Sequence, residues 1–186
     1  MAPSAGDAGG PRRGQERKVS TTPPSIDEAA FRAALGSFAT GVGVMTTEVD
    51  GVWHGMTANA VSSVSLEPPL VLVCVARSAA MAGHVVAGGV FALSFLAASQ
   101  SGYSNRFADS STTSEEKFAG VAARPEVTGA PVLDGAVGWV DCRVWSVADG
   151  GDHIIAIGEV VAAGARPQAA PLVYFRGAYG GFGTAS

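Results

Sequence analysis

The order of hydrophobic and polar positions predicts a chain built mainly of short β-strands. Six apolar residues, Leu70 to Val75, follow one another after Glu67-Pro68-Pro69, a pattern typical of a strand buried on both faces. Asp50-Gly51 is the strongest short hairpin signal in the chain. Strands are expected at residues 42–49, 52–61, 69–76, 90–96, 138–147, 153–162 and 172–175.

Three short helices are expected around these strands. The first follows a capping-box pattern, with Ser25 as N-cap and Glu28 at the third helical position, and places Phe31, Leu35 and Phe38 on one face. The other segments are helices at residues 78–87 and 99–109, a polar excursion at 110–130 and a glycine-rich tail at 177–186.

The predicted domain organisation is simple. Residues 1–25 are rich in Gly, Pro, Ala and Ser without a hydrophobic period, and are expected to be a disordered tail. Residues 26–186 are expected to form one mainly β domain. Six or seven mostly antiparallel strands with peripheral helices favour a small closed or split β-barrel of Greek-key type.

Composition narrows the class of protein. The chain is 47% hydrophobic and 15% charged, yet no apolar run approaches the roughly 20 residues of a membrane span. The N-terminus has no apolar leader, so we expect a cytoplasmic protein without membrane contact. The first 25 residues hold four of the 12 Lys and Arg, so the body is more acidic than the net charge of −4. Nucleic acid is therefore not an expected partner.

Several chemical motifs are absent. No GxGxxG or GxxxxGK[ST] opens a helix after a strand, so a Rossmann domain or phosphate loop is not expected. His54, His84 and His153 are scattered, and no metal site is predicted. The two cysteines, Cys74 and Cys142, are expected to be small core hydrophobes.

One stretch gathers polar groups beside the buried strand. Thr57-Ala58-Asn59 and three serines precede the strand, and Arg77-Ser78 follows it. Hydroxyls, an amide and a guanidinium next to an apolar floor are typical of one wall of a small-molecule site, and a guanidinium suits phosphate. The alternative is a hairpin whose serines cap turns, with Arg77 as a solvated surface side chain.

This stretch, GMTANAVSSVSLEPPLVLVC, resembles the signature of the short-chain flavin reductases, the reductase partners of two-component flavin monooxygenases. Three more segments fit in order: residues 37–42, residues 91–96, and Gly151-Asp152-His153 with Ile157-Gly158-Glu159-Val160. The resemblance covers roughly residues 31–175. It implies an FMN-binding split β-barrel that works as a homodimer and reduces free FMN or FAD with NADH or NADPH.

The resemblance also implies roles for particular residues. Thr57, Ala58 and Asn59 would lie along the isoalloxazine, whereas Ser62, Ser63, Ser65, Arg77 and Ser78 would hold the phosphate and ribityl chain. Phe107 would cover the flavin unless it is a core aromatic, and Tyr174 would approach it. Gly151, Asp152 and His153 would contact the nicotinamide nucleotide. Ala60-Val61 departs from the family, where an aromatic often stands, which leaves FMN versus FAD open.

The predicted function is an NAD(P)H:flavin oxidoreductase that passes reduced flavin to a separate oxygenase. Hydride transfer between stacked rings needs no acid–base group, so no catalytic side chain is assigned. One alternative is a pyridoxamine-phosphate oxidase type, whose substrate phosphate needs several cations; Lys18 and Lys117 are the only lysines here. The other is a non-catalytic flavin-binding barrel.

Overall fold

The computed structural model describes residues 26–182, so the predicted tail at 1–25 lies outside it. The main feature is a seven-stranded antiparallel sheet in the order β3-β2-β6-β9-β10-β5-β4. Its strands are β2 (Gly43–Val49), β3 (Val52–Ala58), β4 (Val61–Leu66), β5 (Pro69–Ala76), β6 (Val90–Phe95), β9 (Gly138–Gly150) and β10 (His153–Ala165). The predicted mainly antiparallel β fold is confirmed.

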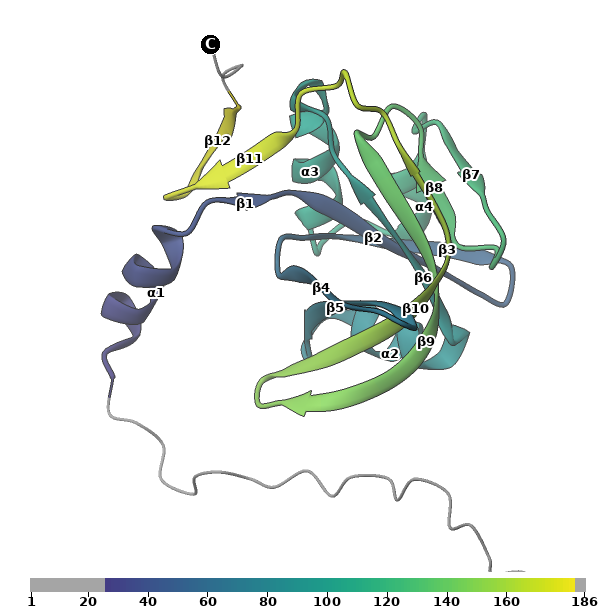
Figure 1. Cartoon of the computed structure of the whole chain (residues 1–186), viewed down its shortest axis with the longest axis horizontal. Coiled ribbons are helices and arrows are strands. Elements are labelled where there is room, and N and C mark those ends of the chain that lie inside the picture. The colour runs from purple at the N-terminus through teal and green to yellow at the C-terminus, as the bar shows by residue number, and fades with distance from the viewer. Residues whose placement is uncertain (1–25, 183–186) are drawn as a thin grey trace, which may run out of the picture.

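The two edge strands of this sheet, β3 and β4, are consecutive in the chain. Only Asn59 and Ala60 lie between them. The sheet therefore has to curl until its first and last strands meet, which produces a barrel (Figure 1). At this meeting point the amide of Cys74 donates to the carbonyl of Ala60 at 3.0 Å. We call residues 57–60 with the adjoining end of β4 the seam of the barrel.

Smaller elements surround the barrel (Figure 1). They are a sheet of β1 (Thr40–Gly41), β11 (Leu172–Phe175) and β12 (Ala178–Gly181), a pair of β7 (Ala123–Pro125) and β8 (Pro131–Leu133), and the helices α1 (Glu28–Gly36), α2 (Ala80–Gly88), η1 (Ala98–Gln100), α3 (Ser101–Ala108) and α4 (Ser114–Phe118). The predicted tail was wrong at 178–181, because these residues pair with β11. Residues 183–186 lie outside the described part.

The predicted hairpin between β2 and β3 is confirmed. Asp50 and Gly51 both have positive φ, 51° and 80°, as a two-residue type I′ turn requires. The predicted second strand ran on to Val61, which was wrong. The strand ends at Ala58 because the chain crosses the seam there and pairs with β5 instead.

The barrel interior is filled by apolar side chains. Met45, Phe91 and Leu93 are completely buried, together with Val73 and Val75 of β5. Only these two residues of β5 are fully buried, because its alternate side chains lie on the outside of the barrel. The prediction of a strand buried on both faces was therefore wrong.

The two cysteines lie on β5 and β9, which are separated in the sheet by β10, and both are free. Cys142 is a buried core residue, as predicted, and burial followed by the charge of Asp141 raises the pKa of its thiol to about 12. Cys74 is half-buried on β5. Cys142 is therefore a packing residue rather than a nucleophile.

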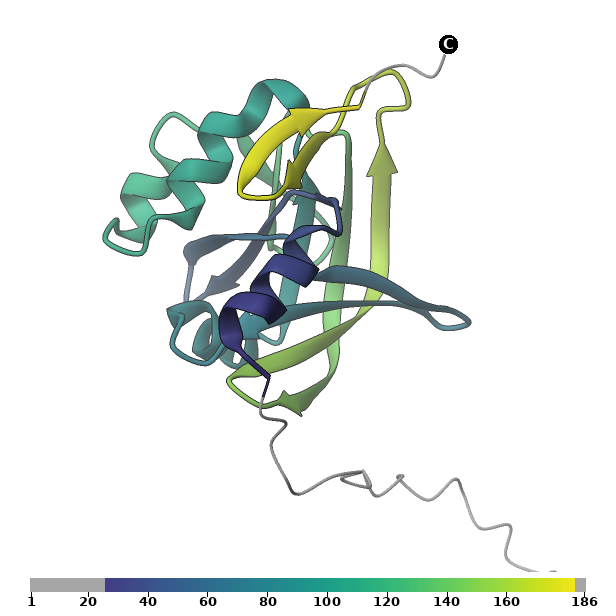
Figure 2. The same ribbon diagram turned by 90° about the vertical axis from the view of Figure 1, so that its left-hand side faces the viewer.

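Helix α1 stands outside the barrel beside the small sheet (Figures 1 and 2). It begins at Glu28 with Asp27 as N-cap, whose side chain accepts from the amide of Ala30, so the assignment of Ser25 as N-cap was wrong. Its apolar face is exposed, with Phe31 at 51% and Leu35 at 55%. Between residues 26 and 182 no helix combines the length and hydropathy needed to cross a membrane.

Candidate functional site

The seam brings two of the three predicted ring-binding residues, Thr57 and Asn59, to the barrel surface. Thr57 donates its hydroxyl to the carbonyl of Ser104 on α3 at 2.6 Å, which fixes the end of β3 against that helix. Ala58 is buried, and Asn59 is exposed with its amide 3.3 Å from the hydroxyl of Thr40. Asn59 is thus an exposed polar residue just after the end of β3, and its amide is suited to the polar edge of a flat ring.

The three predicted serines lie on β4, an edge strand of the main sheet. Ser62 and Ser63 are exposed, and the Ser62 hydroxyl donates to the carbonyl of Ser63 at 3.0 Å. Ser65 accepts from the amide of Glu67 at 3.2 Å, which is the turn-capping role that the alternative interpretation gave it. The β4–β5 hairpin extends away from the barrel (Figure 2). The two exposed hydroxyls are therefore open to a ligand on the outside of the seam.

A cavity of about 380 Å³ opens beside the seam, between β3, the start of α2 and the segment from α3 to α4. Thr57, Ser78 and Phe107 of the predicted residues line it. The Phe107 ring is only 1% exposed and packs edge-on against Phe118, with 5.1 Å between ring centroids. It is a core aromatic that forms the cavity wall, so the structure favours the second of its two predicted roles.

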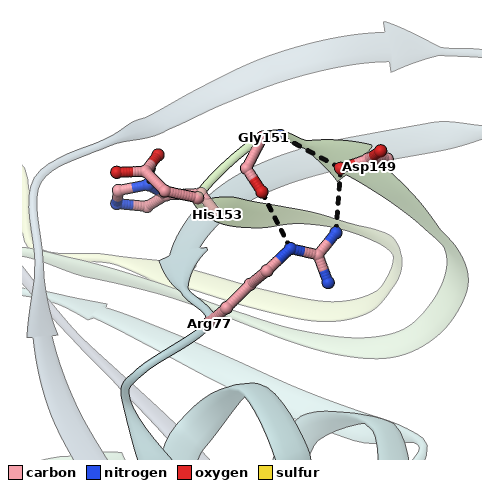
Figure 3. A network of polar contacts seen from close by, with 5 residues as sticks. Arg77, Asp149, Gly151 and His153 are labelled. Atoms are coloured by element: carbon pink, nitrogen blue, oxygen red, sulfur yellow. Dashed lines mark hydrogen bonds and ion pairs between the residues drawn. The ribbon is translucent and has the colours of Figure 1, made fainter.

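Arg77 joins the end of β5 to the turn between β9 and β10 (Figure 3). Its Nε donates to the carbonyl of Gly151 and its Nη2 contacts Oδ1 of Asp149, both at 2.9 Å. Its backbone amide also donates to the carbonyl of Asp152 at 2.9 Å. The fork that was predicted to hold phosphate is thus engaged by the β9–β10 turn.

The turn that Arg77 holds carries the predicted nucleotide-binding residues. Gly151 adopts φ of 79°, which suits glycine, and Asp152 and His153 follow it. Nδ1 of His153 lies 2.8 Å from Oδ1 of Asp152, and this hydrogen bond is the main reason that the pKa of Asp152 is lowered. The His153 side chain points away from the Arg77 contacts and is 42% exposed, so its ring is accessible (Figure 3).

Tyr174 lies on the small sheet, where it pairs with Thr40 of β1. Its ring is 5.6 Å from that of Tyr179 on β12, and the Tyr179 hydroxyl lies 2.9 Å from Oγ of Ser104. Thr40 is also the partner of Asn59. The small sheet therefore borders the seam, which brings Tyr174 to the same side of the barrel as the predicted ring site.

Three cavity residues were not predicted from the sequence as site residues. His54 of β3 and His84 of α2 stack with 3.7 Å between ring centroids. Nζ of Lys117 on α4 donates to the carbonyls of Gly55 and Phe107 at 3.4 and 3.3 Å. Burial, and to a lesser extent His84, lowers the pKa of His54, and burial lowers that of Lys117. The histidines are thirty positions apart, so no sequence pattern joins them.

The geometry defines a class of protein: a small antiparallel barrel with polar side chains at its seam and a cavity beside it. A model of the flavin reductase like domain matches residues 35–183, and the chain belongs to this family. Its fold is the split barrel of solved flavin reductases.

Individual relatives align with this chain over most of their length. A flavin reductase of Pseudomonas putida is 38% identical over 159 residues, covering 85% of this chain and 92% of that protein. The reductase subunit HsaB of a flavin-dependent monooxygenase from Mycobacterium tuberculosis is 38% identical over 158 residues, covering 84% and 83%. The Streptomyces globisporus NADH:FAD oxidoreductase SgcE6, solved with NAD and FAD fragments, has a TM-score of 0.80 and 36% identity, covering 89% and 98%.

Proposed function

We propose that this protein is an NAD(P)H:flavin oxidoreductase that reduces FMN or FAD by hydride transfer and supplies reduced flavin to a separate monooxygenase. Family membership supports the reductase class, and the relative named as a monooxygenase subunit supports the oxygenase partner. The observation that carries the proposal is the contact of Arg77 with Gly151. This contact fixes the His153 turn to β5, whose partner strand β4 begins at the seam.

The residues present fit a flavin nucleotide. The Asn59 amide and the exposed hydroxyls of Ser62 and Ser63 supply polar groups for its ring edge and ribityl chain, and Ser78 faces the adjoining cavity. A bound flavin supplies the hydride-accepting chemistry. The chain would orient the two rings and exclude water, with Tyr174 closing the side of the small sheet and Ala58 backing the seam.

In this proposal His153 and Asp152 bind the nicotinamide nucleotide. The turn is exposed and Gly151 leaves it without a side chain, so a flat group can approach the His153 ring closely. The carboxylate of Asp152 accepts a hydrogen bond from Nδ1 of His153 and so orients that ring. Its role would be to donate to or stack on the nucleotide, since transfer of a hydride needs no proton carrier at this position.

We also propose a cytoplasmic homodimer. Phe31 and Leu35 on α1, and Phe38 just after its end, are all more than half exposed in the described chain and are suited to burial against a second copy of it. Trp145 and Val147 on β9 are further exposed apolar side chains. A contact between two such copies would remove these side chains from water.

The deciding experiment is NADH oxidation by the purified protein with and without added FMN or FAD. Turnover that rises with flavin concentration and gives one reduced flavin for each NADH consumed is the expected result, and NADPH is compared in parallel. Flavin binding without NADH or NADPH oxidation would instead identify a non-catalytic flavin-binding barrel. A Gly151→Val variant, which places a β-branched residue at a positive φ and so strains the turn, should lower turnover while flavin binding persists.

A further inference from the structure

The cavity beside the seam collects groups suited to an anion. His54, His84 and Lys117 line it from three different elements: β3, α2 and α4. Five hydroxyl-bearing residues share the lining, namely Thr57, Ser78, Ser110, Thr112 and Ser114. No Asp or Glu is among the lining residues that the structure describes. A concave site with one ammonium, two imidazoles, several hydroxyls and no carboxylate attracts negative charge.

The stacked histidines are held in place but are not closed to a ligand. Nδ1 of His54 lies 2.7 Å from Oγ of Ser114, which positions one ring, and the second ring stacks on it at 3.7 Å. Both side chains are half-buried and border the cavity. The Lys117 ammonium has three donors, of which two go to carbonyls, leaving one for a ligand.

We propose that this cavity binds the phosphate group of the flavin nucleotide, and that the His54–His84 pair takes up one proton when the phosphate binds. The proposal rests on the proposed function, since it concerns the same ligand. It moves the phosphate from Arg77, whose fork is engaged by Asp149 and Gly151, to a cavity that Ser78 already faces. It also makes flavin affinity depend on pH.

The direction of this dependence follows from the charges that face the pair. Lys117 is the charged lining group, and Asp109 acts on it from beyond the end of α3. Burial and the neighbouring imidazole keep His54 neutral in the free protein near pH 7. A bound phosphate favours the protonated ring, so its pKa rises on binding and FMN affinity must increase as the pH falls.

The ligand's own ionisation acts in the opposite direction. A phosphate monoester has its second pKa near 6, so acidification below that value removes negative charge from FMN. Tighter binding of FMN at pH 6.5 than at pH 8.5 would therefore have to come from the protein. Riboflavin has the same ring and ribityl chain without the phosphate, and is the matched ligand control.

The test is fluorescence titration of the full chain with FMN and riboflavin at pH 6.5 and 8.5. For one linked proton we expect the FMN Kd to be about five- to tenfold lower at pH 6.5, with the riboflavin Kd changed less than about twofold. The double variant His54→Gln with His84→Gln should lose this pH dependence. His153→Gln, which removes the other histidine, should keep it.

A further variant keeps the inference testable if the double variant does not fold. His84→Lys places a permanent charge on α2 and should bind FMN at pH 8.5 about as tightly as the wild type does at pH 6.5. Equal FMN and riboflavin affinities in a protein that still oxidises NADH would overturn this inference and leave the proposed function standing. An FMN pH dependence that survives the double variant would overturn it too. Failure of both flavins to bind or turn over would overturn the proposed function itself.

Discussion

Nε of Arg77 lies 2.9 Å from the carbonyl oxygen of Gly151, and this contact ties β5 to the turn that carries His153. The accompanying ion pair to Asp149 is about half exposed and should contribute less than about 1 kcal/mol to stability. The contact therefore matters for position more than for folding. Arg77, one of the predicted site residues, thereby holds the turn that carries His153, another of them.

Arg77→Ala should loosen this turn. We expect the NADH KM to rise about two- to fivefold, with the free energy of unfolding changed by less than about 1 kcal/mol. Asp149→Asn is the matched variant and should raise the NADH KM in the same direction, but less. If Arg77→Ala instead raises the FMN Kd about ten- to a hundredfold and leaves the NADH KM unchanged, Arg77 binds the flavin phosphate directly.

His153→Ala should weaken nucleotide binding selectively. A lost neutral hydrogen bond is worth about 0.5–1.5 kcal/mol, so the NADH KM should rise about two- to tenfold while the FMN Kd stays the same. His153→Gln keeps a donor and should recover part of the loss. If flavin binding collapses and the NADH KM does not move, His153 belongs to the flavin site.

Gly55→Ala should destabilise the cavity wall. A Cβ on Gly55 would lie 2.5 Å from Cε1 of Phe107, which is buried and cannot move away freely. Overpacking of this kind costs about 1–3 kcal/mol, measured by denaturant unfolding. Gly83→Ala in α2 is the control, because nothing lies within 4 Å of its added Cβ and helix propensity should make it neutral or stabilising. Equal behaviour of the two variants would contradict the packing.

The homodimer predicts a role for α1. Phe31→Ser with Leu35→Ser should shift the protein to a monomer in sedimentation at micromolar concentration, since both side chains are more than half exposed in one chain. Arg32→Gln on the same helix, which removes an exposed ion pair with Glu28 but no apolar side chain, should leave the dimer intact. A wild-type chain that sediments as a monomer would exclude the dimer altogether.

The flavin-free protein should lose stability as the pH falls. Mainly because of burial, the pKa of His54 is lower in the folded protein than its ordinary value of 6.5. As the pH falls below 6.5, the unfolded chain therefore binds more protons at this residue than the folded chain does, and the folded state loses stability. The melting temperature should therefore decline from pH 7.5 to pH 5, and His54→Gln should reduce that decline. Saturating FMN should offset more of the loss at the lower pH. If His54→Gln leaves the decline in melting temperature unchanged, groups other than His54 cause it.

The sequence predicted those parts of the fold that carry local signals. Asp50-Gly51 fixed one hairpin, and the strand at Leu172–Phe175 matches its predicted bounds. Strand β12 was missed because Ala178-Tyr179-Gly180-Gly181 has no alternation of apolar and polar positions. The start of α1 was misplaced because Asp27 and Ser25 are both good caps, and only the structure shows which one is used.

The site was predictable in its motifs but not in its contacts. The sequence pointed to Arg77 and His153 separately, but their connection through Gly151 depends on the pairing of β5 with β10. The His54–His84 stack depends on where α2 packs across β3, which no spacing in the chain encodes. The contacts within the site therefore depend on packing between elements far apart in the chain, which the sequence patterns do not reveal.

The seam between β3 and β4 has a consequence for the dynamics of the barrel. Its two sides belong to opposite edges of one sheet and are held by a two-residue connection, so opening of the sheet widens the very place where the flavin ring is proposed to lie. A ligand that contacts both sides binds the closed barrel and therefore stabilises it against opening. Flavin should then slow amide hydrogen exchange at Ala58 and Val61 together, while exchange in the distant β7–β8 pair is unchanged.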